Sequence, residues 1–425
     1  MHPLTKELLL HIQEKYQLND YVLHESFYRR EKMHGETQYS LETCWFPINH
    51  GSWSEDESYP DGTIEIQVDT VTKQTTSIHL HGADTIHSIP NDLRDSDIRI
   101  SWLEQELGMT FDKQFMLLTH QDSLYQYVSC HNGIRLSPGL FISLELTDDG
   151  ALDSFSMFGT PALSNKYPTE SFTLSLEQIA PNISQQLRRF SVPNEHQRKL
   201  AYAVEEIFVS QDGLRTYPLS NPETSSVVLN EIVTWDKPST FSYKRKLIKR
   251  RELVTARDAE AQTPHPDYRP LTDEMLETCQ SIAVDLIAAE YPEESGAWTI
   301  QEINRDFPFI NVVVRRTRDD INLAYKRRLT ILLIEDTYEV SLIVDNEAFI
   351  DLYHDSTQPL PDSSVPEEVI RHALMPYLTL KPYYVFDQTL NQYVLCGLLD
   401  SNHAYLPATN EVVLLDDLYV ILATD

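Results

Sequence analysis

The sequence predicts an α+β fold in which each helix is followed by strands that hairpins can join. Three observations lead to this prediction. Apolar residues recur at helical spacing in five segments of the chain. Runs of alternating apolar and polar residues follow each of these segments. Turn residues, rather than further helices, separate the runs, so we expect antiparallel sheets with the helices packed on one face.

Three of the five expected helices begin at capping residues or at a residue favoured in a first turn. Asp95 or Ser96 can cap the second helix, and Thr272 can cap the fourth. Pro366 suits the first turn of the fifth, whereas Pro181 should kink or delay the third. The expected helices are Leu4–Leu18, Asp95–Leu107, a segment from Ser175 to Leu187, Met275–Tyr291 and a segment from Pro366.

The expected strands come in groups after each helix, and the Asp148-Asp149-Gly150 turn predicts a hairpin in the second group. The expected strands are Tyr39–Phe46, Thr63–Asp69, Thr75–His81, Tyr125–Ser129, Gly139–Leu146, Leu152–Phe158, Leu200–Phe208, Ser226–Trp235, Phe309–Arg316, Leu323–Ile334, Tyr338–Val344, Tyr383–Phe386, Tyr393–Leu399 and Glu411–Leu415.

The proline-rich stretch AEAQTPHPDYRP, from Ala259 to Pro270, has no regular spacing of apolar residues. It is therefore the best candidate for a domain boundary. A weaker boundary falls between Gly159 and Glu170. We therefore predict three domains. An N-terminal module with two helix-then-strands units covers residues 1–165, a middle unit covers 166–262, and a C-terminal module with two units covers 263–425.

Composition narrows the class of protein. Hydrophobic residues make up 41% of the 425, which is enough for packed cores. Only 12 glycines are present, which disfavours glycine-rich phosphate-binding loops. The formal net charge is −31 at pH 7. Because such a surface repels nucleic-acid phosphates and anionic lipid heads, we expect neither nucleic acid nor a membrane as partner.

The cysteines and the N-terminal residues favour a cytoplasmic location. Cys44, Cys130, Cys279 and Cys396 are widely spaced and have mostly apolar or aromatic neighbours, which predicts buried free thiols. The first residues contain an apolar run of only three leucines. A signal peptide or a membrane span requires a longer apolar run, so we expect neither.

Three strand-turn-strand stretches share a pattern: IEIQVDTVTKQTTSIHL (Ile64–Leu80), ISLELTDDGALDSFSMF (Ile142–Phe158) and YLPATNEVVLL (Tyr405–Leu415). They resemble the PepSY-type units and the related YcdB/YcdC repeat domains of Gram-positive bacteria. The glycine of the family pattern is replaced by Gln74 in the first stretch and by Asn410 in the last. The resemblance implies tandem PepSY-like helix-plus-antiparallel-sheet units, binding or inhibition of partner proteins such as peptidases, no shared catalytic residues, and a location outside the membrane.

His79 and His81 are the best candidates for metal ligands. Alternate residues of a strand point to one face, so the two imidazoles could share an ion. The sequence nominates no reliable third ligand, and solvated strand histidines are the favoured interpretation. No HExxH, GxSxG, GxGxxG or GxxxxGK[ST] motif occurs. We therefore favour a protein that is not an enzyme and expect no cofactor, with a metal-dependent hydrolase using these two histidines as an alternative.

Basic residues gather at two places in this acidic chain. Six of the eight residues from Lys244 to Arg251 are basic, and a second group flanks the expected turn at Asp319-Asp320. They could bind an acidic partner or an anion; alternatively, they pair internally with Asp and Glu or protect a strand edge. The candidate partner-binding residues are Lys244, Arg245, Lys246, Lys249, Arg250, Arg251, Arg315, Arg316 and Arg318, and Lys326, Arg327 and Arg328 complete the second group.

These observations predict a non-enzymatic binding or regulatory protein built of repeated units. Its partner would be a protein, and a peptidase-modulating role is one form that the interaction could take. Two alternatives remain open at this point. One is the metal-dependent hydrolase, and the other is a structural component of a larger assembly.

Overall fold

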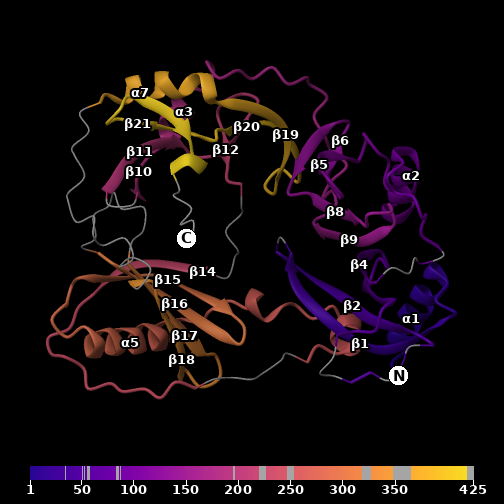
Figure 1. The fold of residues 1–425 in the computed structure, drawn as a ribbon. Coiled ribbons are helices and arrows are strands. Elements are labelled where there is room, and N and C mark those ends of the chain that lie inside the picture. Colours follow the sequence, from indigo (N-terminus) through magenta and orange to yellow (C-terminus); the bar gives the residue numbers. More distant parts are fainter. Residues whose placement is uncertain are drawn as a thin grey trace. The chain divides into compact units, whose positions relative to one another are not determined.

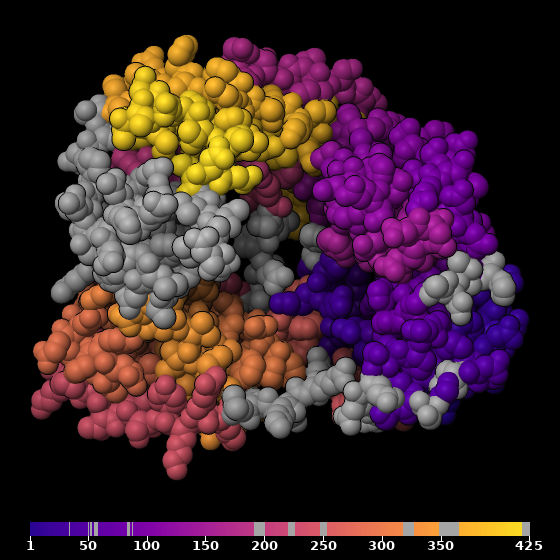
Figure 2. Space-filling model, viewed as in Figure 1, coloured from indigo at the N-terminus to yellow at the C-terminus, as the bar shows by residue number. Residues whose placement is uncertain are grey.

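The computed structural model describes residues 1–33, 35–49, 51, 53–54, 58–82, 86, 88–194, 197–219, 226–246, 253–317, 327–347 and 365–418 (Figure 1). Figure 2 draws the same view with all atoms, and residues outside this description are grey. The chain divides into two compact units of three segments each. Unit 1 contains Met1–Phe172, Arg251–His265 and Pro382–Cys396, and unit 2 contains Thr173–Arg250, Pro266–Lys381 and Gly397–Asp425.

Unit 1 is built on a long sheet with strand order β1-β2-β3-β4-β9-β8-β6-β7-β19, and β5 pairs with β6. Its helices are α1 (Pro3–Tyr16), α2 (Ser96–Leu107) and α4 (Ala256–Glu260). Its strands are β1 (Tyr21–Met33), β2 (Glu36–Pro47), β3 (Thr63–Asp69), β4 (Thr75–His81), β5 (Phe115–Gln121), β6 (Leu124–His131), β7 (Ile134–Ser137), β8 (Leu140–Leu146) and β9 (Leu152–Gly159). Two further strands, β19 (Thr379–Asp387) and β20 (Gln392–Asp400), are each divided between unit 1 and unit 2.

One apolar core holds unit 1 together. Leu8 and Ile12, one helical turn apart on α1, are fully buried against Ile66 of β3. Trp102 of α2 packs on Phe155 of β9, with ring centroids 5.6 Å apart and nearly perpendicular. Burial of this apolar surface is the main force that holds the helices to the sheet.

Unit 2 contains two further sheets, with strand orders β10-β11-β21-β22 and β14-β15-β16-β17-β18. Its helical elements are α3 (Ala180–Gln186), η1 (Pro266–Tyr268), α5 (Asp273–Glu290), α7 (Glu367–Leu374), η2 (Met375–Tyr377) and η3 (Asp416–Leu418). Its strands are β10 (Leu187–Asn194), β11 (Gln197–Val204), β12 (Ile207–Ser210), β13 (Thr216–Tyr217), β14 (Ser226–Val233), β15 (Trp298–Asp306), β16 (Phe309–Arg316), β17 (Arg328–Ile334), β18 (Val340–Asp345), β21 (His403–Leu406) and β22 (Glu411–Leu414).

The five-stranded sheet of unit 2 has one face covered by α5 (Figure 1). Cys279, Ala283 and Leu286 of α5 share an apolar cluster with alternate strand residues such as Ile300 and Val314. Residues between these positions must point to the opposite face, because side chains alternate along a strand. The sheet therefore has a core face and a second face that α5 does not cover.

The prediction of a mixed α+β fold with mostly antiparallel strands is confirmed. Pairings such as β1 with β2, β8 with β9 and β15 with β16 are antiparallel, whereas β7 pairs in parallel with β19. The predicted caps are also confirmed. Asp95 accepts hydrogen bonds from the first turn of α2, and Thr272 does so for α5. Helix α3 starts at Ala180, as expected from Pro181.

The sequence missed several strands, among them β1, β5 and β15. The expected strand at Leu323–Ile334 is observed from Arg328, and its residues 323–326 lie outside the described part of the chain. Unit 2 resumes at Pro266, inside the proline-rich stretch predicted as a boundary. The three domains remain a prediction about independent folding.

Candidate functional site

The first basic stretch follows the edge of a sheet. The backbone N–H of Lys246 donates to the carbonyl of Val340 (3.3 Å), and the Ser341 hydroxyl donates to the Lys246 carbonyl (2.8 Å). These contacts cover the edge strand β18. The Lys246 ammonium is paired with Glu339, whose carboxyl pKa it lowers through that hydrogen bond. Lys244 and Arg245 are exposed, while Lys249, Arg250 and Arg251 lie outside the described residues.

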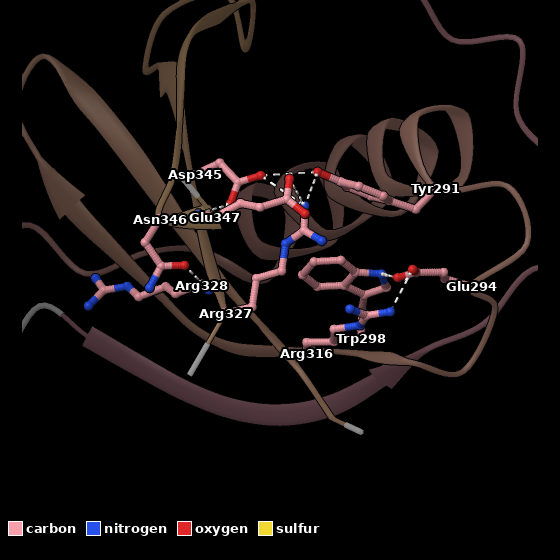
Figure 3. Close-up of polar contacts among 9 residues, drawn as sticks. All are labelled: Tyr291, Glu294, Trp298, Arg316, Arg327, Arg328, Asp345, Asn346 and Glu347. Atoms are coloured by element: carbon pink, nitrogen blue, oxygen red, sulfur yellow. Dashed lines mark hydrogen bonds and ion pairs between the residues drawn. The ribbon is translucent and has the colours of Figure 1, made fainter. Parts of the chain in front are cut away.

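Arg327, from the second basic group, is held inside unit 2 (Figure 3). Its Nη2 lies 3.1 Å from Asp345 Oδ2, 2.6 Å from Glu347 Oε2 and 3.1 Å from the Tyr291 hydroxyl. Its guanidinium lies 5.0 Å from the Tyr291 ring centroid and 5.4 Å from that of Trp298. Burial, assisted by the charge of Asp345, raises the pKa of Tyr291 to about 12. Arg327 therefore joins the end of α5 to β18.

Arg316 is also paired within unit 2. Its Nη2 lies 2.7 Å from Glu294 Oε1, and the other oxygen of the same carboxylate accepts a 2.9 Å hydrogen bond from the Trp298 indole. Figure 3 shows this pair beside the Arg327 contacts. Arg318, the remaining predicted residue of this group, lies outside the described residues. Arg316 and Arg327 thus serve the packing of the sheet on α5.

Arg315 and Arg328 behave differently. They are directly opposite each other on β16 and β17, and both are exposed. Within the described part of the chain, neither guanidinium has a hydrogen bond or an ion pair. In Figure 3 the side chain of Arg328 extends away from the Arg327 contacts. Like charges directly opposite on neighbouring strands are destabilising. Among the described residues, no carboxylate pairs with either of these two positive charges.

The strand register places further residues around the two arginines. One row across the sheet runs Ile232, Thr299, Arg315 and Arg328, and the next runs Val228, Glu302, Val313, Thr330 and Val344. We name the exposed and half-buried residues of these rows, together with Thr317, which contacts Thr299, the arginine face; Val313 is buried and is not included. The arginine face consists of Val228, Ile232, Thr299, Glu302, Arg315, Thr317, Arg328, Thr330 and Val344.

The arginine face combines apolar and hydrogen-bonding groups. Val228, Ile232 and Val344 are exposed by 63%, 60% and 50%, which is high for aliphatic strand residues. The hydroxyls of Thr299 and Thr317 lie 2.7 Å apart beside Arg315. The one acidic residue of this set, Glu302, accepts a hydrogen bond from Ser226 (3.1 Å). The arginine face therefore carries a net positive charge in a chain of net charge −31.

The predicted metal candidates lie on the other unit, on β4. The His79 and His81 rings are 4.5 Å apart, and His81 Nε2 lies 2.9 Å from Glu65 Oε2. The ring of His81 also meets that of Tyr59, with centroids 5.3 Å apart. Among the residues that the structure describes, no group of three or more His, Cys, Asp or Glu side chains has the arrangement of a metal site. The two histidines are therefore side chains of a polar and aromatic cluster.

The prediction of free thiols is confirmed for all four cysteines, which are buried and unbridged. Burial raises the pKa of Cys44 and of Cys279 to about 12, and it also raises the pKa of Cys130. A buried thiol with a raised pKa stays neutral at physiological pH, and the thiolate is the reactive form. These three cysteines are therefore unsuited to nucleophilic catalysis.

Sequence reasoning missed two parts of the arginine face. It grouped Arg315 with Arg316, although the two residues point to opposite faces, and it named Arg328 only as one member of the second basic group. It also did not connect Ile232 with either arginine. Residue alternation within Phe309–Arg316 could have separated the two arginines, but the row that joins Ile232 to Arg328 depends on pairing across four strands.

Comparison with known proteins adds little to this geometry. No protein-family model matches the chain, and no curated protein matches it. A solved structure, the YpeB C-terminal domain of Bacillus megaterium, is similar at 12% sequence identity with a TM-score of 0.24. The match covers 51% of this chain and 97% of that domain. A similarity of this size carries no argument for the fold or the function.

In the described part of the chain, no helix has the length and apolar character needed to cross a bilayer.

Proposed function

We propose that this chain is a non-enzymatic binding protein that takes an acidic segment of a partner protein on its arginine face. The observation that carries the proposal is the opposed pair Arg315 and Arg328, both exposed and without a carboxylate partner among the described residues. Guanidinium groups bind carboxylates through two parallel N–H donors, which gives such contacts strength and orientation. An acidic ligand would supply the negative charge that these two arginines lack among the described residues.

The apolar residues of the arginine face support a peptide rather than a simple anion. Ile232 lies in the same row as the two arginines, and Val228 and Val344 lie in the next row. An extended segment that carries acidic and apolar side chains would contact both kinds of residue. Burial of exposed aliphatic side chains contributes roughly 25 cal/mol per Å² of area removed from water. Electrostatic attraction would guide the encounter, and apolar contact would slow dissociation.

The sequence resemblance supports the same class of function. We propose that the units are PepSY-like, with helices on one face of their sheets, since such domains bind or inhibit partner proteins. A peptidase is one partner of this kind. The cytoplasmic location also stays a proposal, supported by four free buried cysteines, because disulfides are rare in that compartment. No observation favours the hydrolase or the structural component over binding.

The test uses labelled peptides of about ten residues, the length of a long strand. Glu and Val take turns at every second position, so that both kinds of side chain lie on one face of the extended peptide, and Thr fills the positions between them. Binding to the full chain is measured by fluorescence anisotropy. The double variant Arg315→Gln/Arg328→Gln should weaken binding on the order of 100-fold, about 2.7 kcal/mol. Binding to the unmodified protein should also weaken as salt rises from about 50 mM to about 500 mM.

A matched control removes two positive charges elsewhere. Arg188 is half exposed and pairs with Glu205, and Arg257 is exposed on α4. The variant Arg188→Gln/Arg257→Gln has the same net charge as the test variant and should bind the peptides as the unmodified protein does. Equal losses in the two double variants would show a general charge effect and contradict the proposal. Unchanged binding in the Arg315/Arg328 variant would contradict it as well.

A further inference from the structure

The two guanidinium groups of the arginine face are arranged for one ligand group rather than two. Residues directly opposite on antiparallel strands have Cβ atoms about 4.5–5.5 Å apart. Arg315 and Arg328 have this relationship, so both guanidiniums can reach the same small anion. A carboxylate has one negative charge and two oxygens, and a single arginine can satisfy it. A second arginine at this spacing favours a group with more charge and more acceptors.

We infer that the preferred ligand of the arginine face is a phosphate monoester on a serine or threonine of the partner segment. This inference rests on the proposed function and names the chemistry of its ligand. A phosphorylated hydroxyl carries a charge of about −1.5 to −2 at neutral pH and three acceptor oxygens. Two guanidinium forks match that charge and can approach those oxygens from two sides.

The threonine pair beside Arg315 adds to this match. Thr299 and Thr317 are 2.7 Å apart through their hydroxyl oxygens, and Thr299 is the residue opposite Arg315 on β15. In such a pair one hydroxyl donates to the other, and the second hydroxyl keeps its proton for an outside acceptor. A phosphate oxygen held by Arg315 is such an acceptor. The site then offers a neutral donor in addition to two charged ones.

The acidic groups near the two arginines, in the part of the chain that the structure describes, do not cancel this preference. Glu302 is the acidic residue of the arginine face, and it lies in the row next to the arginines rather than in theirs. It also accepts a hydrogen bond from Ser226. The carboxylates that bind Arg316 and Arg327 are on the side of α5. Within the row, Arg315 lies between Arg328 and Thr299, and Ile232 lies one strand beyond Thr299.

The experiment compares three peptide libraries of about nine residues that differ only at the central residue, which is phosphoserine, Glu or Ser. Binding to the full chain is measured by anisotropy at about pH 7.5, where the phosphate is mostly a dianion. We expect phosphoserine peptides to bind about tenfold tighter than Glu peptides, a difference of about 1.4 kcal/mol. The ratio should fall below about pH 6, where the phosphate dianion takes up one proton and becomes a monoanion, while the charge of the Glu peptide does not change.

Two variants test whether Arg315 and Arg328 cause the preference for phosphoserine over Glu. Arg315→Lys and Arg328→Lys keep the charge and lose the planar fork, so each should reduce the phosphoserine preference to less than about threefold. Arg257→Lys is the control and should keep the full preference. A preference that survives both lysine variants would place the phosphate elsewhere and overturn the inference.

The outcomes separate the inference from the proposed function. If Glu and phosphoserine peptides bind the unmodified protein equally, the phosphate preference is wrong and acidic-peptide binding stands. If neither binds, both are wrong. Inorganic phosphate is added as a competitor in a last arm. If it binds as tightly as the phosphoserine peptide, the ligand is the free anion, and the inference of a modified partner is overturned.

Discussion

Arg315 on β16 and Arg328 on β17 lie directly opposite each other and remain unpaired among the described residues, whereas their chain neighbours Arg316 and Arg327 are bound to carboxylates. Each strand presents one arginine of an adjacent pair to either face of the sheet, because side chains alternate along a strand. The face covered by α5 contains Glu294 and Asp345, which compensate its arginines. The other face has no such carboxylate in the arginine row.

The opposed arginines should cost stability in the free protein. Replacing Arg328 by Gln removes a like-charge contact, so the free energy of unfolding should stay the same or rise by up to about 0.5 kcal/mol. Arg328→Glu should raise it further at low salt, since it places a carboxylate opposite Arg315. Urea denaturation at two salt concentrations measures both effects. A loss of more than about 1 kcal/mol in Arg328→Gln would mean that this arginine has a stabilising partner.

Arg327 should behave in the opposite way. Its substitution by Gln leaves Asp345 and Glu347 without their cation beside Tyr291, and it removes a buried guanidinium from two aromatic rings. Both carboxylates are partly exposed, so we expect a loss of about 2 kcal/mol rather than the ~3–5 kcal/mol of a fully buried pair. Urea denaturation beside Arg328→Gln provides the matched comparison. Equal stability of the two variants would contradict the assigned roles.

The buried thiols should not react in the folded protein. With pKa values of about 12, Cys44 and Cys279 are almost entirely protonated at pH 8, and the thiolate is needed for alkylation. Iodoacetamide should therefore label neither residue in native protein and both in urea. Mass spectrometry of the peptides gives the result. Labelling of either cysteine in the native protein, at the rate found in urea, would show that its thiol is accessible.

The raised pKa values of the same two thiols predict how the free energy of unfolding depends on pH. A free thiol ionises near pH 8.5 in the unfolded chain, and the pKa of Cys44 and Cys279 is about 12 in the folded protein. Between these two pH values the folded state binds more protons than the unfolded state does. The contribution of the thiols to the free energy of unfolding is therefore full below about pH 8.5 and decreases as pH rises toward 12. Denaturation between pH 8 and pH 10 should show this fall. The variant Cys44→Ala/Cys279→Ala should show a smaller fall, and an unchanged slope would contradict the explanation.

Local signals made the helices predictable. Asp95 and Thr272 cap the helices that they were expected to cap, since capping depends on residues within one turn. Strand β1 was missed because it is a sheet edge whose side chains are mostly exposed or half-buried, so alternation is weak. Its position is determined by pairing with β2 over twelve residue pairs. Edges of this kind are defined by tertiary contacts.

The candidate site was only partly predictable for a related reason. The sequence identified two basic groups and suggested internal pairing as one interpretation, which the contacts of Lys246, Arg316 and Arg327 match. It could not separate Arg315 from these residues, because the separation depends on which face each side chain takes and on which carboxylates lie there. Cross-strand register, and not composition, distinguishes the arginine face.

The most direct measurement is nuclear magnetic resonance of the arginine side-chain Nε–H groups during titration with the phosphoserine peptides. Signals are assigned by comparing Arg315→Lys, Arg316→Lys, Arg327→Lys and Arg328→Lys with the unmodified protein. The signals of Arg315 and Arg328 should shift together and saturate at one concentration of peptide, while those of Arg316 and Arg327 should not move. Shifts confined to other arginines, with Arg315 and Arg328 unchanged at saturation, would contradict the assignment of the arginine face as the binding site.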